Sequence, residues 1–154
     1  RLPALSNHYF SPEPEVASNH ITFDTTYQGQ RYRFVTDAGV FSRGEMDKGT
    51  LTLLSATPKT MEGTLLDIGC GWGAVGTILG KTHPALLVTM SDVNSRAVEL
   101  AARNAQAHGV RAEIIQSDGF ENIDGEFDHI LLNPPPFGPA SKSSTVCLRN
   151  VRST

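Results

Sequence analysis

The sequence has few of the features that mark membrane, secreted or metal-binding proteins. It contains only two cysteines, Cys70 and Cys147, far apart and without histidines at zinc-site spacing. Neither a disulfide framework nor a zinc site is therefore expected. No apolar run approaches the roughly 18 residues of a membrane span, and the first residues lack the order of a signal peptide. We expect two free thiols, no metal, no membrane association and a cytoplasmic location.

Positive charge is also scarce. The 154 residues include 13 Lys and Arg against 16 Asp and Glu, which gives a formal net charge of −3. Domains that bind nucleic acid by bulk electrostatics need clustered Lys and Arg, so any contact with nucleic acid is expected to be local. With 39% hydrophobic and 19% charged residues, the composition is typical of one globular domain. The first residue is Arg1 rather than Met, which suggests a fragment or a processed chain.

One stretch, LLDIGCGWGAVG at 65–76, combines the signals of a strand, a tight turn and a helix. Gly69, Gly71 and Gly73 lack Cβ, so they can adopt positive φ and let a ligand lie against the N–H groups that open the next helix. The same residues satisfy the dinucleotide pattern G-x-G-x-x-G, and Asp92 follows at about the expected 20 residues. The glycines therefore permit two cofactors, a dinucleotide and S-adenosylmethionine.

Asp67 favours the second cofactor. A carboxylate directly before the glycines repels a pyrophosphate, whereas it suits a cationic ligand that carries an amino group. S-adenosylmethionine is such a ligand. The alternative is that Asp67 only caps a helix or forms a turn.

The periodicity of apolar residues predicts the order of elements along the chain. We expect a hairpin over 21–34 with its turn at 28–30, and a short helix over 50–56 that acts as a lid beside the glycine turn. Strands are expected at 65–67, 86–90, 112–116 and 127–132, with helices at 73–81 and from 95 to 108 between them. This order predicts an α/β fold with a Rossmann-like, doubly wound, mostly parallel sheet that binds ligands at the carboxyl ends of its strands.

Two further aspartates follow predicted strands. Asp92 is placed to accept hydrogen bonds from both ribose hydroxyls of a nucleotide, because a carboxylate offers two acceptor oxygens. Asp118 could accept from an adenine amino group, and Gly119 would let the ring approach closely. The alternatives are a helix cap for Asp92 and an ordinary turn residue for Asp118.

Asn133, Pro134 and Pro135 directly follow the last apolar strand. An amine becomes nucleophilic when both its N–H bonds are held by acceptors, so that its lone pair points at the methyl group. The Asn133 side-chain oxygen and the Pro134 carbonyl can be these acceptors, and the two prolines restrict the backbone around them. A plain turn is the alternative reading.

These motifs resemble a known family. The segments 67–73, 92–94 and 133–135 are similar to motifs of class I S-adenosylmethionine-dependent methyltransferases, and 40–42 with 47–49 are similar to the small-domain family that includes bacterial ribosomal RNA guanine-N2 methyltransferases. The resemblance implies that Asp67, Asp92 and Asp118 hold the cofactor and that Asn133 orients the target amine. Pro136 stands where family members often have an aromatic residue, and Phe137 comes one position later.

We therefore expect an S-adenosylmethionine-dependent methyltransferase that acts on guanine N2 of ribosomal RNA. The alternatives are a glutamine-amide or adenine-amine methyltransferase, a non-catalytic fragment and an NAD-binding oxidoreductase. The expected organisation is an N-terminal extension with hairpin and lid helix at 1–58, the methyltransferase core at 59–135 and an unstructured tail at 136–154. Because the family fold continues beyond this point, the C-terminal strands are expected to be missing. The strand at 127–132 would then lie at an open edge, and the chain would be poorly soluble or dimeric and inactive.

Overall fold

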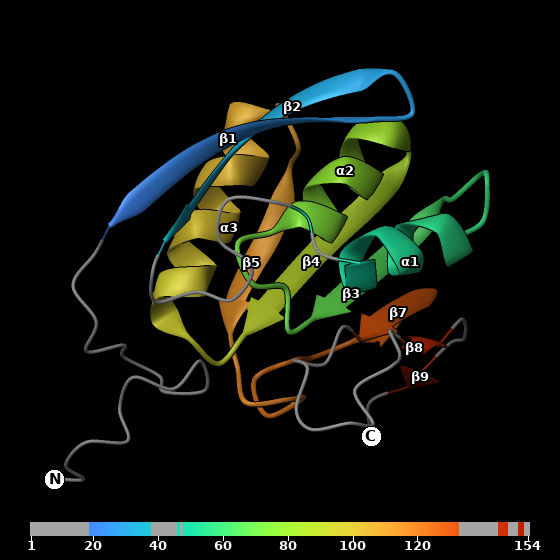
Figure 1. Cartoon of the computed structure of the whole chain (residues 1–154). Helices are drawn as coiled ribbons and strands as arrows, with labels where there is room; N and C mark the ends of the chain where they lie inside the picture. Colours follow the sequence, from blue (N-terminus) through green and yellow to red (C-terminus); the bar gives the residue numbers. More distant parts are fainter. Residues whose placement is uncertain (1–18, 38–45, 47, 133–144, 148–150, 153–154) are drawn as a thin grey trace, which may run out of the picture.

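The computed structural model describes residues 19–37, 46, 48–132, 145–147 and 151–152. At its centre lies a five-stranded sheet in the order β5-β4-β3-β7-β8 (Figure 1). The strands are β3 (Gly63–Ile68), β4 (Leu86–Asp92), β5 (Ala112–Gln116), β7 (His129–Leu132) and β8 (Thr145–Cys147). Neighbouring strands among the first four pair in parallel, and β8 pairs antiparallel with β7. The expected parallel sheet is confirmed.

The two central strands are apolar and largely buried, as strands covered on both sides must be. In β3, Leu65 and Leu66 are both fully buried and belong to different clusters. Leu65 packs in the main core beneath the helices, whereas Leu66 joins a smaller cluster with Ile123 and Ile130 on the opposite face. Asp67 has the same parity as Leu65, so its side chain points toward the helix side of the sheet.

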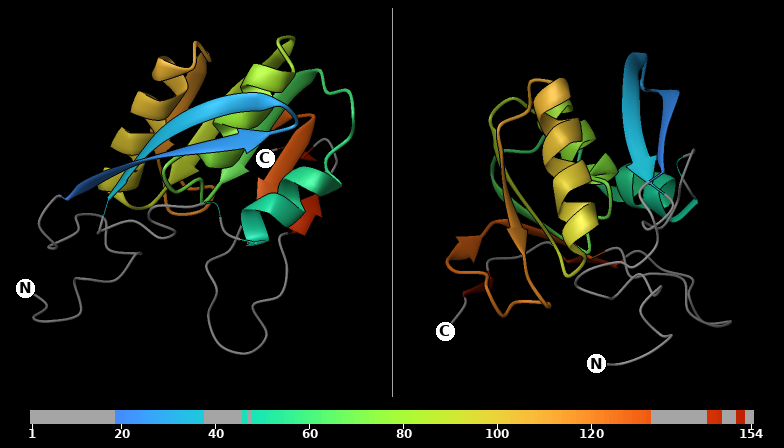
Figure 2. Two further views of the ribbon diagram at one scale, coloured as in Figure 1. Left: turned by 45° about the horizontal axis from the view of Figure 1, so that its top comes forward. Right: turned by 90° about the vertical axis from the view of Figure 1, so that its left-hand side faces the viewer.

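Three helices are described, and Figure 2 shows them on one side of the sheet. They are α1 (Lys48–Ala56), α2 (Ala74–Thr82) and α3 (Ser95–Ala107). Asn94 is the N-cap of α3, because its side-chain oxygen accepts from the backbone N–H groups of Arg96 and Ala97. No helix in the described part of the chain is long and apolar enough to cross a membrane.

The expected hairpin is confirmed and lies on the outer side of the helix layer (Figure 2). Its strands are β1 (His20–Tyr27) and β2 (Gln30–Asp37), joined through two residues with positive φ, Gln28 and Gly29. Positive φ at both central positions is the geometry of the two-residue turn that fits the twist of antiparallel strands. The hairpin is therefore a third layer over the helices.

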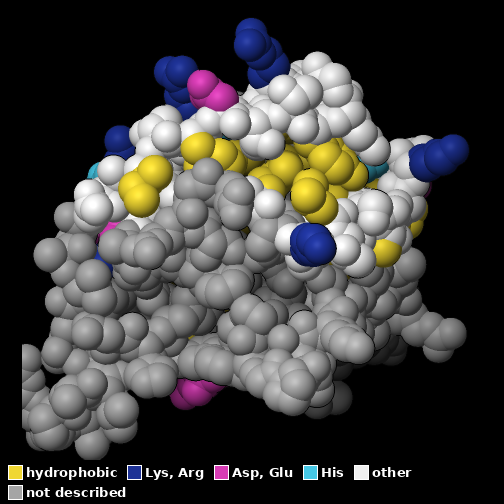
Figure 3. All heavy atoms as spheres, viewed as in Figure 1, with side chains coloured by type: hydrophobic (Ala, Val, Ile, Leu, Met, Phe, Trp, Pro, Cys, Tyr) yellow, Lys and Arg dark blue, Asp and Glu magenta, His cyan; other side chains and the backbone are white. Residues whose placement is uncertain are grey.

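Hydrophobic side chains gather on the surface between the hairpin and α1 (Figure 3). Phe23, Tyr27 and Val35 are partly buried and pack against the core from the hairpin side. Leu51 of α1 is 41% exposed. The expected helix at 50–56 is confirmed as α1, and its role as a lid stays a prediction.

The C-terminal part of the sheet differs from the expectation in two ways. The strand expected at 127–132 is interrupted at Asp128, which exchanges hydrogen bonds with Thr64 through side chains rather than through a regular ladder. The expected strand is therefore divided into a short β6 (Glu126–Phe127) and, after Asp128, β7. Strand β6 pairs antiparallel with β9 (Val151–Arg152).

The expectation that 136–154 contains no strand is wrong for Thr145–Cys147 and Val151–Arg152. The edge of β7 presents backbone donors and acceptors, and an extended segment can pair with them whatever its side-chain period. Strand β8 pairs with β7 over Ile130, Leu131 and Leu132, so β7 does not lie at an open edge. The expectation of poor solubility depended on such an open edge and therefore loses its basis. The predicted boundaries of the methyltransferase core, after residues 58 and 135, stay predictions.

Candidate functional site

The order of the strands creates a switch point at the carboxyl end of β3. From β3 the chain moves to β4 and β5 on one side, and it then returns to β7 on the other side. Ligands of open α/β sheets bind in the crevice at such a point. Asp67 pairs in register with Met90 of β4 and Leu131 of β7, so it lies at this point. Asn133, Pro134 and Pro135 come next after β7 but lie outside the described residues, and their role stays a prediction.

The glycine turn, defined here as residues 69–73, has the backbone conformation that its sequence predicts. Gly69, Gly71 and Gly73 have φ of 73°, 56° and 92°, in the left-handed region that favours glycine. The N–H groups of Gly69 and Cys70 both donate to the carbonyl of Ser91, at 2.9 Å each. The turn is therefore fastened to the end of β4.

The side chain of Asp92 also holds the glycine turn through hydrogen bonds. Its Oδ2 accepts from the N–H of Gly71 at 2.9 Å, and its Oδ1 accepts from the N–H of Asn94 at 3.0 Å. The carboxylate thereby joins the glycine turn to the start of α3, which is a structural role beside the predicted one. Each carboxylate oxygen can accept more than one hydrogen bond, so ribose binding by Asp92, which is 2% exposed, stays a prediction.

Asp67 is the unusual group of the site. It is 1% exposed, and neither carboxylate oxygen has a hydrogen-bond partner among the described residues. Burial, and then the negative charge of Asp92, raise its pKa from 3.8 to about 7. The backbone N–H of Gly76 acts in the opposite direction and lowers this pKa, but it does not reach hydrogen-bond geometry with either oxygen. An acid buried in this way, beside a second carboxylate, is suited to a cationic partner.

The structure brings Asp67 and Asp92 together as buried groups, whereas Asp118 is exposed, next to Ser117, whose N–H donates to the carbonyl of Asp92 at 3.0 Å. Asp118 follows β5 on an exposed turn, where its carbonyl accepts from the N–H of Glu121. Gly119 has a φ of 58°, and the neighbouring Phe120 is 51% exposed. Asp118 therefore lies at the surface on the strand-end side of the sheet, and contact with an adenine stays a prediction.

Cys70 lies within the glycine turn as a free, buried thiol. Burial raises its pKa well above the usual value, and the charges of Asp92 and Asp67 raise it further. The thiol is therefore neutral at physiological pH and unsuited to act as a nucleophile. The side chain of Cys147 lies outside the described residues. Within the described ranges, no group of three His, Cys, Asp or Glu side chains could hold a metal ion.

Sequence reasoning missed the contacts that reach the glycine turn from other elements. Asn104 of α3 donates to the carbonyl of Trp72 at 2.7 Å. The rings of Phe34 and Phe23 lie 4.9 and 5.3 Å from the Trp72 ring. A signal for Asn104 was present, because it shares the buried face of α3 with Ala97 and Ala101, where an amide needs hydrogen-bond partners.

Comparison with protein families decides the membership of this chain. The family model described as methyltransferase small domain matches residues 31–152. The chain belongs to this family. The resemblance inferred from the motifs is thereby confirmed.

Related sequences agree with this membership. The chain is 40% identical over 135 residues to the uncharacterized protein YbxB of Bacillus subtilis, which covers 85% of this chain and 67% of that protein. It is 41% identical over 110 residues to ribosomal RNA small subunit methyltransferase C of Serratia proteamaculans, covering 71% of this chain and 32% of the relative. The chain thus spans about a third of the length of that curated relative.

Solved structures agree with the fold. The T. thermophilus 16S rRNA N2 G1207 methyltransferase (RsmC), in complex with AdoMet and guanosine, superposes with a TM-score of 0.71 at 28% identity. The match covers 82% of this chain and 36% of that one. A Pyrococcus abyssi tRNA (uracil-54, C5)-methyltransferase shares the fold with a TM-score of 0.58 at 22% identity, over 75% of this chain and 28% of its own. The expected Rossmann-like architecture is confirmed.

Proposed function

We propose that this chain is the cofactor-binding part of an S-adenosylmethionine-dependent N-methyltransferase that acts on guanine N2 of ribosomal RNA. The observation that carries the proposal is the buried carboxylate of Asp67, which has no hydrogen-bond partner among the described residues and lies before a glycine turn at the switch point of the sheet. The amino group of S-adenosylmethionine would supply the missing cation. A pyrophosphate in the same place would meet the negative charges of Asp67 and Asp92, which disfavours an NAD-binding oxidoreductase.

Four parts of the site would hold the cofactor. Asp67 would bind the amino group, the glycine turn would lie against the aminoacyl part and the sugar, and Asp92 would accept from the ribose hydroxyls. Asp118 would accept from the adenine amino group. When bound, S-adenosylmethionine supplies a methyl group on a sulfonium, which is a strong electrophile with a neutral leaving group.

Asn133, Pro134 and Pro135 would bind the amine that is methylated. The Asn133 side-chain oxygen and the Pro134 carbonyl would each accept one N–H of guanine N2, so that the nitrogen lone pair points at the methyl carbon. Methyl transfer would form the new N–C bond at N2 and break the S–C bond, and one N2 proton would pass to solvent. Pro135 has no N–H to compete for these acceptors.

The choice of ribosomal RNA and of guanine N2 is supported by two relatives. One is named ribosomal RNA small subunit methyltransferase C, and the other is the RsmC structure with guanosine bound. The formal net charge of −3 is compatible with this substrate where cations are supplied locally or by further parts of a longer protein.

Cofactor binding is tested by calorimetry with S-adenosylmethionine, its demethylated product and NAD. We expect the first two to bind and NAD not to bind. Asp67→Asn should weaken binding by about tenfold or more, because it removes a charge-assisted hydrogen bond in a buried site. Asp24→Asn, an exposed change on the hairpin, serves as a matched control and should leave the affinity unchanged.

The pH dependence of binding adds a second criterion. Because the pKa of Asp67 is about 7, the free protein loses the required negative charge as the pH falls through neutrality. The affinity should therefore decrease from about pH 7 to about pH 5 in the unmodified chain, where the amino group of the ligand stays protonated, and stay flat in Asp67→Asn. Tight NAD binding without any binding of the methyl donor would contradict the proposal.

The substrate is tested by transfer of a labelled methyl group. Naked ribosomal RNA, assembled ribosomal subunits and total protein are compared as acceptors, and modified nucleosides are then identified. N2-methylguanosine as the product would support the proposal. Label in glutamine side chains or in adenine would instead assign the alternative amine, since both can use the Asn133 geometry.

A further inference from the structure

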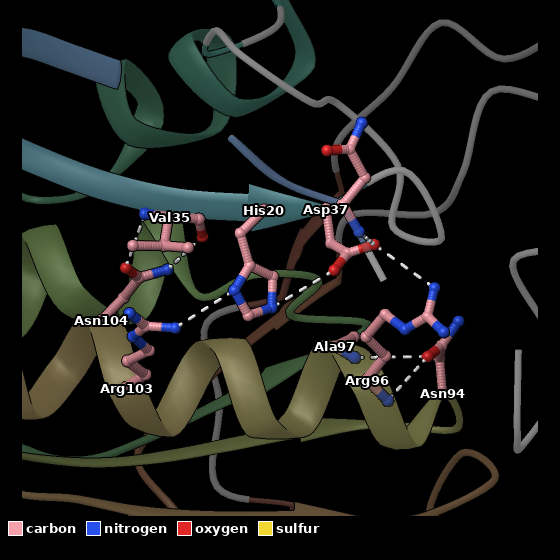
Figure 4. A network of polar contacts seen from close by, with 9 residues as sticks. His20, Val35, Asp37, Asn94, Arg96, Ala97, Arg103 and Asn104 are labelled. Carbon is pink, nitrogen blue, oxygen red and sulfur yellow. Dashed lines mark hydrogen bonds and ion pairs between the residues drawn. The ribbon is translucent and has the colours of Figure 1, made fainter. Parts of the chain in front are cut away.

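Three parts of the molecule meet at the side chain of Asn104. This residue lies in α3 and is 1% exposed. Its Nδ2 donates to the carbonyl of Val35 in β2 at 2.9 Å and to the carbonyl of Trp72 in the glycine turn at 2.7 Å. Its Oδ1 accepts from the N–H of Val35 at 2.9 Å. Figure 4 shows the pair that it forms with Val35 across the gap between α3 and the hairpin. Both amide hydrogens are therefore used, each by a different element.

The contact with Trp72 acts on a peptide group that the glycine turn also holds from within, since the N–H of Gly73 donates to the carbonyl of Cys70 at 3.0 Å. Trp72 stands between Gly71 and Gly73, and glycine has more backbone freedom than any other residue. The carbonyl of Trp72 and the N–H of Gly73 belong to one planar peptide group, so a donor that holds the carbonyl also orients the N–H. Ser91 and Asp92 hold the turn from β4, and Asn104 holds it from the helix layer.

We propose that Asn104 is a positioning residue for the cofactor: it sets the conformation of the glycine turn through the Trp72 peptide and couples the turn to the hairpin. The inference rests on the proposed function, in which this turn binds S-adenosylmethionine. Asn104 does not itself touch the cofactor. Because coupling between two sites is reciprocal, cofactor bound at the turn should also tighten the hairpin around Val35.

A purely structural role in attaching the hairpin is the competing explanation, and His108 provides the means to separate the two. His108 is the C-cap residue of the same helix, and its Nε2 accepts from the N–H of Arg33 at 3.2 Å. Its ring also lies 5.0 Å from that of Phe34 and 5.4 Å from that of Tyr32. His108 thus attaches the same strand to the same helix, but none of the hydrogen bonds that it makes with described residues reaches the glycine turn.

The test compares Asn104→Asp with His108→Ala in the whole chain. Asn104→Asp keeps the size of the side chain and the acceptor for Val35, but it replaces the donor with an oxygen that faces two carbonyls. We expect the dissociation constant for S-adenosylmethionine to rise by about tenfold or more, because the N–H groups of the glycine turn would no longer point at the charged groups of the cofactor. His108→Ala should change it by less than about twofold. Both variants are compared at equal folded fraction, determined from thermal unfolding.

Fluorescence supplies a readout that lost stability alone would not change. Trp72 is the single tryptophan of the chain and is 3% exposed, so the emission reports on the glycine turn itself. In Asn104→Asp we expect the emission of the folded protein to shift to longer wavelength, and the change caused by S-adenosylmethionine in the unmodified chain to be reduced. Unchanged emission together with unchanged affinity would show that Asn104 only attaches the hairpin.

Hydrogen exchange of the unmodified chain keeps the inference testable where Asn104→Asp does not fold. The N–H of Val35 should exchange more slowly with S-adenosylmethionine than without it, although it lies outside the proposed binding site. Equal exchange rates would overturn the coupling. Failure of the unmodified chain to bind S-adenosylmethionine would overturn the proposed function instead, so the two failures are distinguishable.

Discussion

At the scale of single residues, the surroundings of Asp67 lower the stability of the protein when this side chain is ionised. A buried carboxylate is costly unless it is paired, and the described residues provide Asp67 with no hydrogen bond and with the like charge of Asp92 nearby. The result is a pKa of about 7 in place of 3.8. Groups whose pKa is shifted in this way mark functional sites more often than structural ones.

The substitution Asp67→Asn should therefore stabilise the protein in the absence of ligand. The pKa of Asp67 is 3.8 in the unfolded chain and about 7 in the folded protein, so between these pH values the folded state binds more protons. The favourable contribution of protonated Asp67 to the free energy of unfolding is therefore complete below pH 3.8. It is lost as the pH rises through about 7. This loss amounts to about 4 kcal/mol at most, since each pKa unit corresponds to about 1.4 kcal/mol, and the buried amide of the variant reduces the gain.

The free energy of unfolding in urea checks this prediction. Asp67→Asn should be more stable than the unmodified chain at about pH 8, and the difference should shrink toward about pH 5. Asp24→Asn, on the surface of the hairpin, should show no gain. A gain that is independent of pH would mean that the ionisation of Asp67 does not cause it.

At the scale of elements, the site depends on a close approach between the glycine turn and α3. Gly73 has a φ of 92°, and a Cβ at this position would lie 2.9 Å from the Cα of Ala101. The small side chains on the buried face of α3 permit this approach, and Asn104 and Asp92 fasten it. The turn and the helix are therefore positioned as one unit.

We predict that Gly73→Ala lowers the free energy of unfolding more than the substitution of a glycine that has positive φ but no close neighbour. Gly109, with a φ of 69° and no atom within 4 Å of a built Cβ, is the matched control. Gly109→Ala should cost about 1–2 kcal/mol for the left-handed conformation alone. Gly73→Ala should cost at least about 1 kcal/mol more, because the backbone of Ala101 cannot move aside as a flexible side chain could.

Urea unfolding and calorimetry with S-adenosylmethionine distinguish the two variants. Gly109→Ala should retain the affinity of the unmodified chain, whereas Gly73→Ala should lose most of it. Equal destabilisation and equal affinity would show that the approach of the turn to α3 is not tight in solution.

At the scale of the whole molecule, the hairpin and the sheet domain share one core. Phe34 is fully buried, with its ring 4.9 Å from that of Trp72 and 5.0 Å from that of His108. Asp37 at the end of β2 accepts from Arg96 in the first turn of α3 at 3.3 Å (Figure 4). The hairpin is therefore integrated with the described core, although it belongs to the extension predicted at 1–58.

Phe34→Ala should destabilise the whole described unit rather than the hairpin alone. Removal of a fully buried phenylalanine costs about 3–5 kcal/mol, and because the ring packs against Trp72, the loss should appear in one cooperative transition. Phe120→Ala, at a side chain that is 51% exposed, should change the stability by no more than about 0.5 kcal/mol. Two separate transitions, followed by circular dichroism and Trp72 fluorescence, would contradict a shared core.

The sequence by itself determined the features that depend on neighbouring residues. Alternation of apolar residues located the hairpin, helical periodicity located α3, and the three alternate glycines located the glycine turn. The order of the parallel strands along the chain followed from local patterns, whereas their order across the sheet, β5-β4-β3-β7, came from the structure. The roles of Asn133, Pro134 and Pro135 were also inferred from local patterns and stay predictions.

Only the tertiary structure decided what depends on contacts between residues far apart in the chain. The pKa of Asp67 is set by burial and by Asp92, and the hydrogen bonds of Asn104 join α3 to Val35 and Trp72. The pairing of β8 with β7 is made by backbone groups, which every residue carries, so no pattern of side chains predicts it. A single sequence encodes local propensity directly, whereas burial, charge proximity and strand partners exist only once the chain has folded.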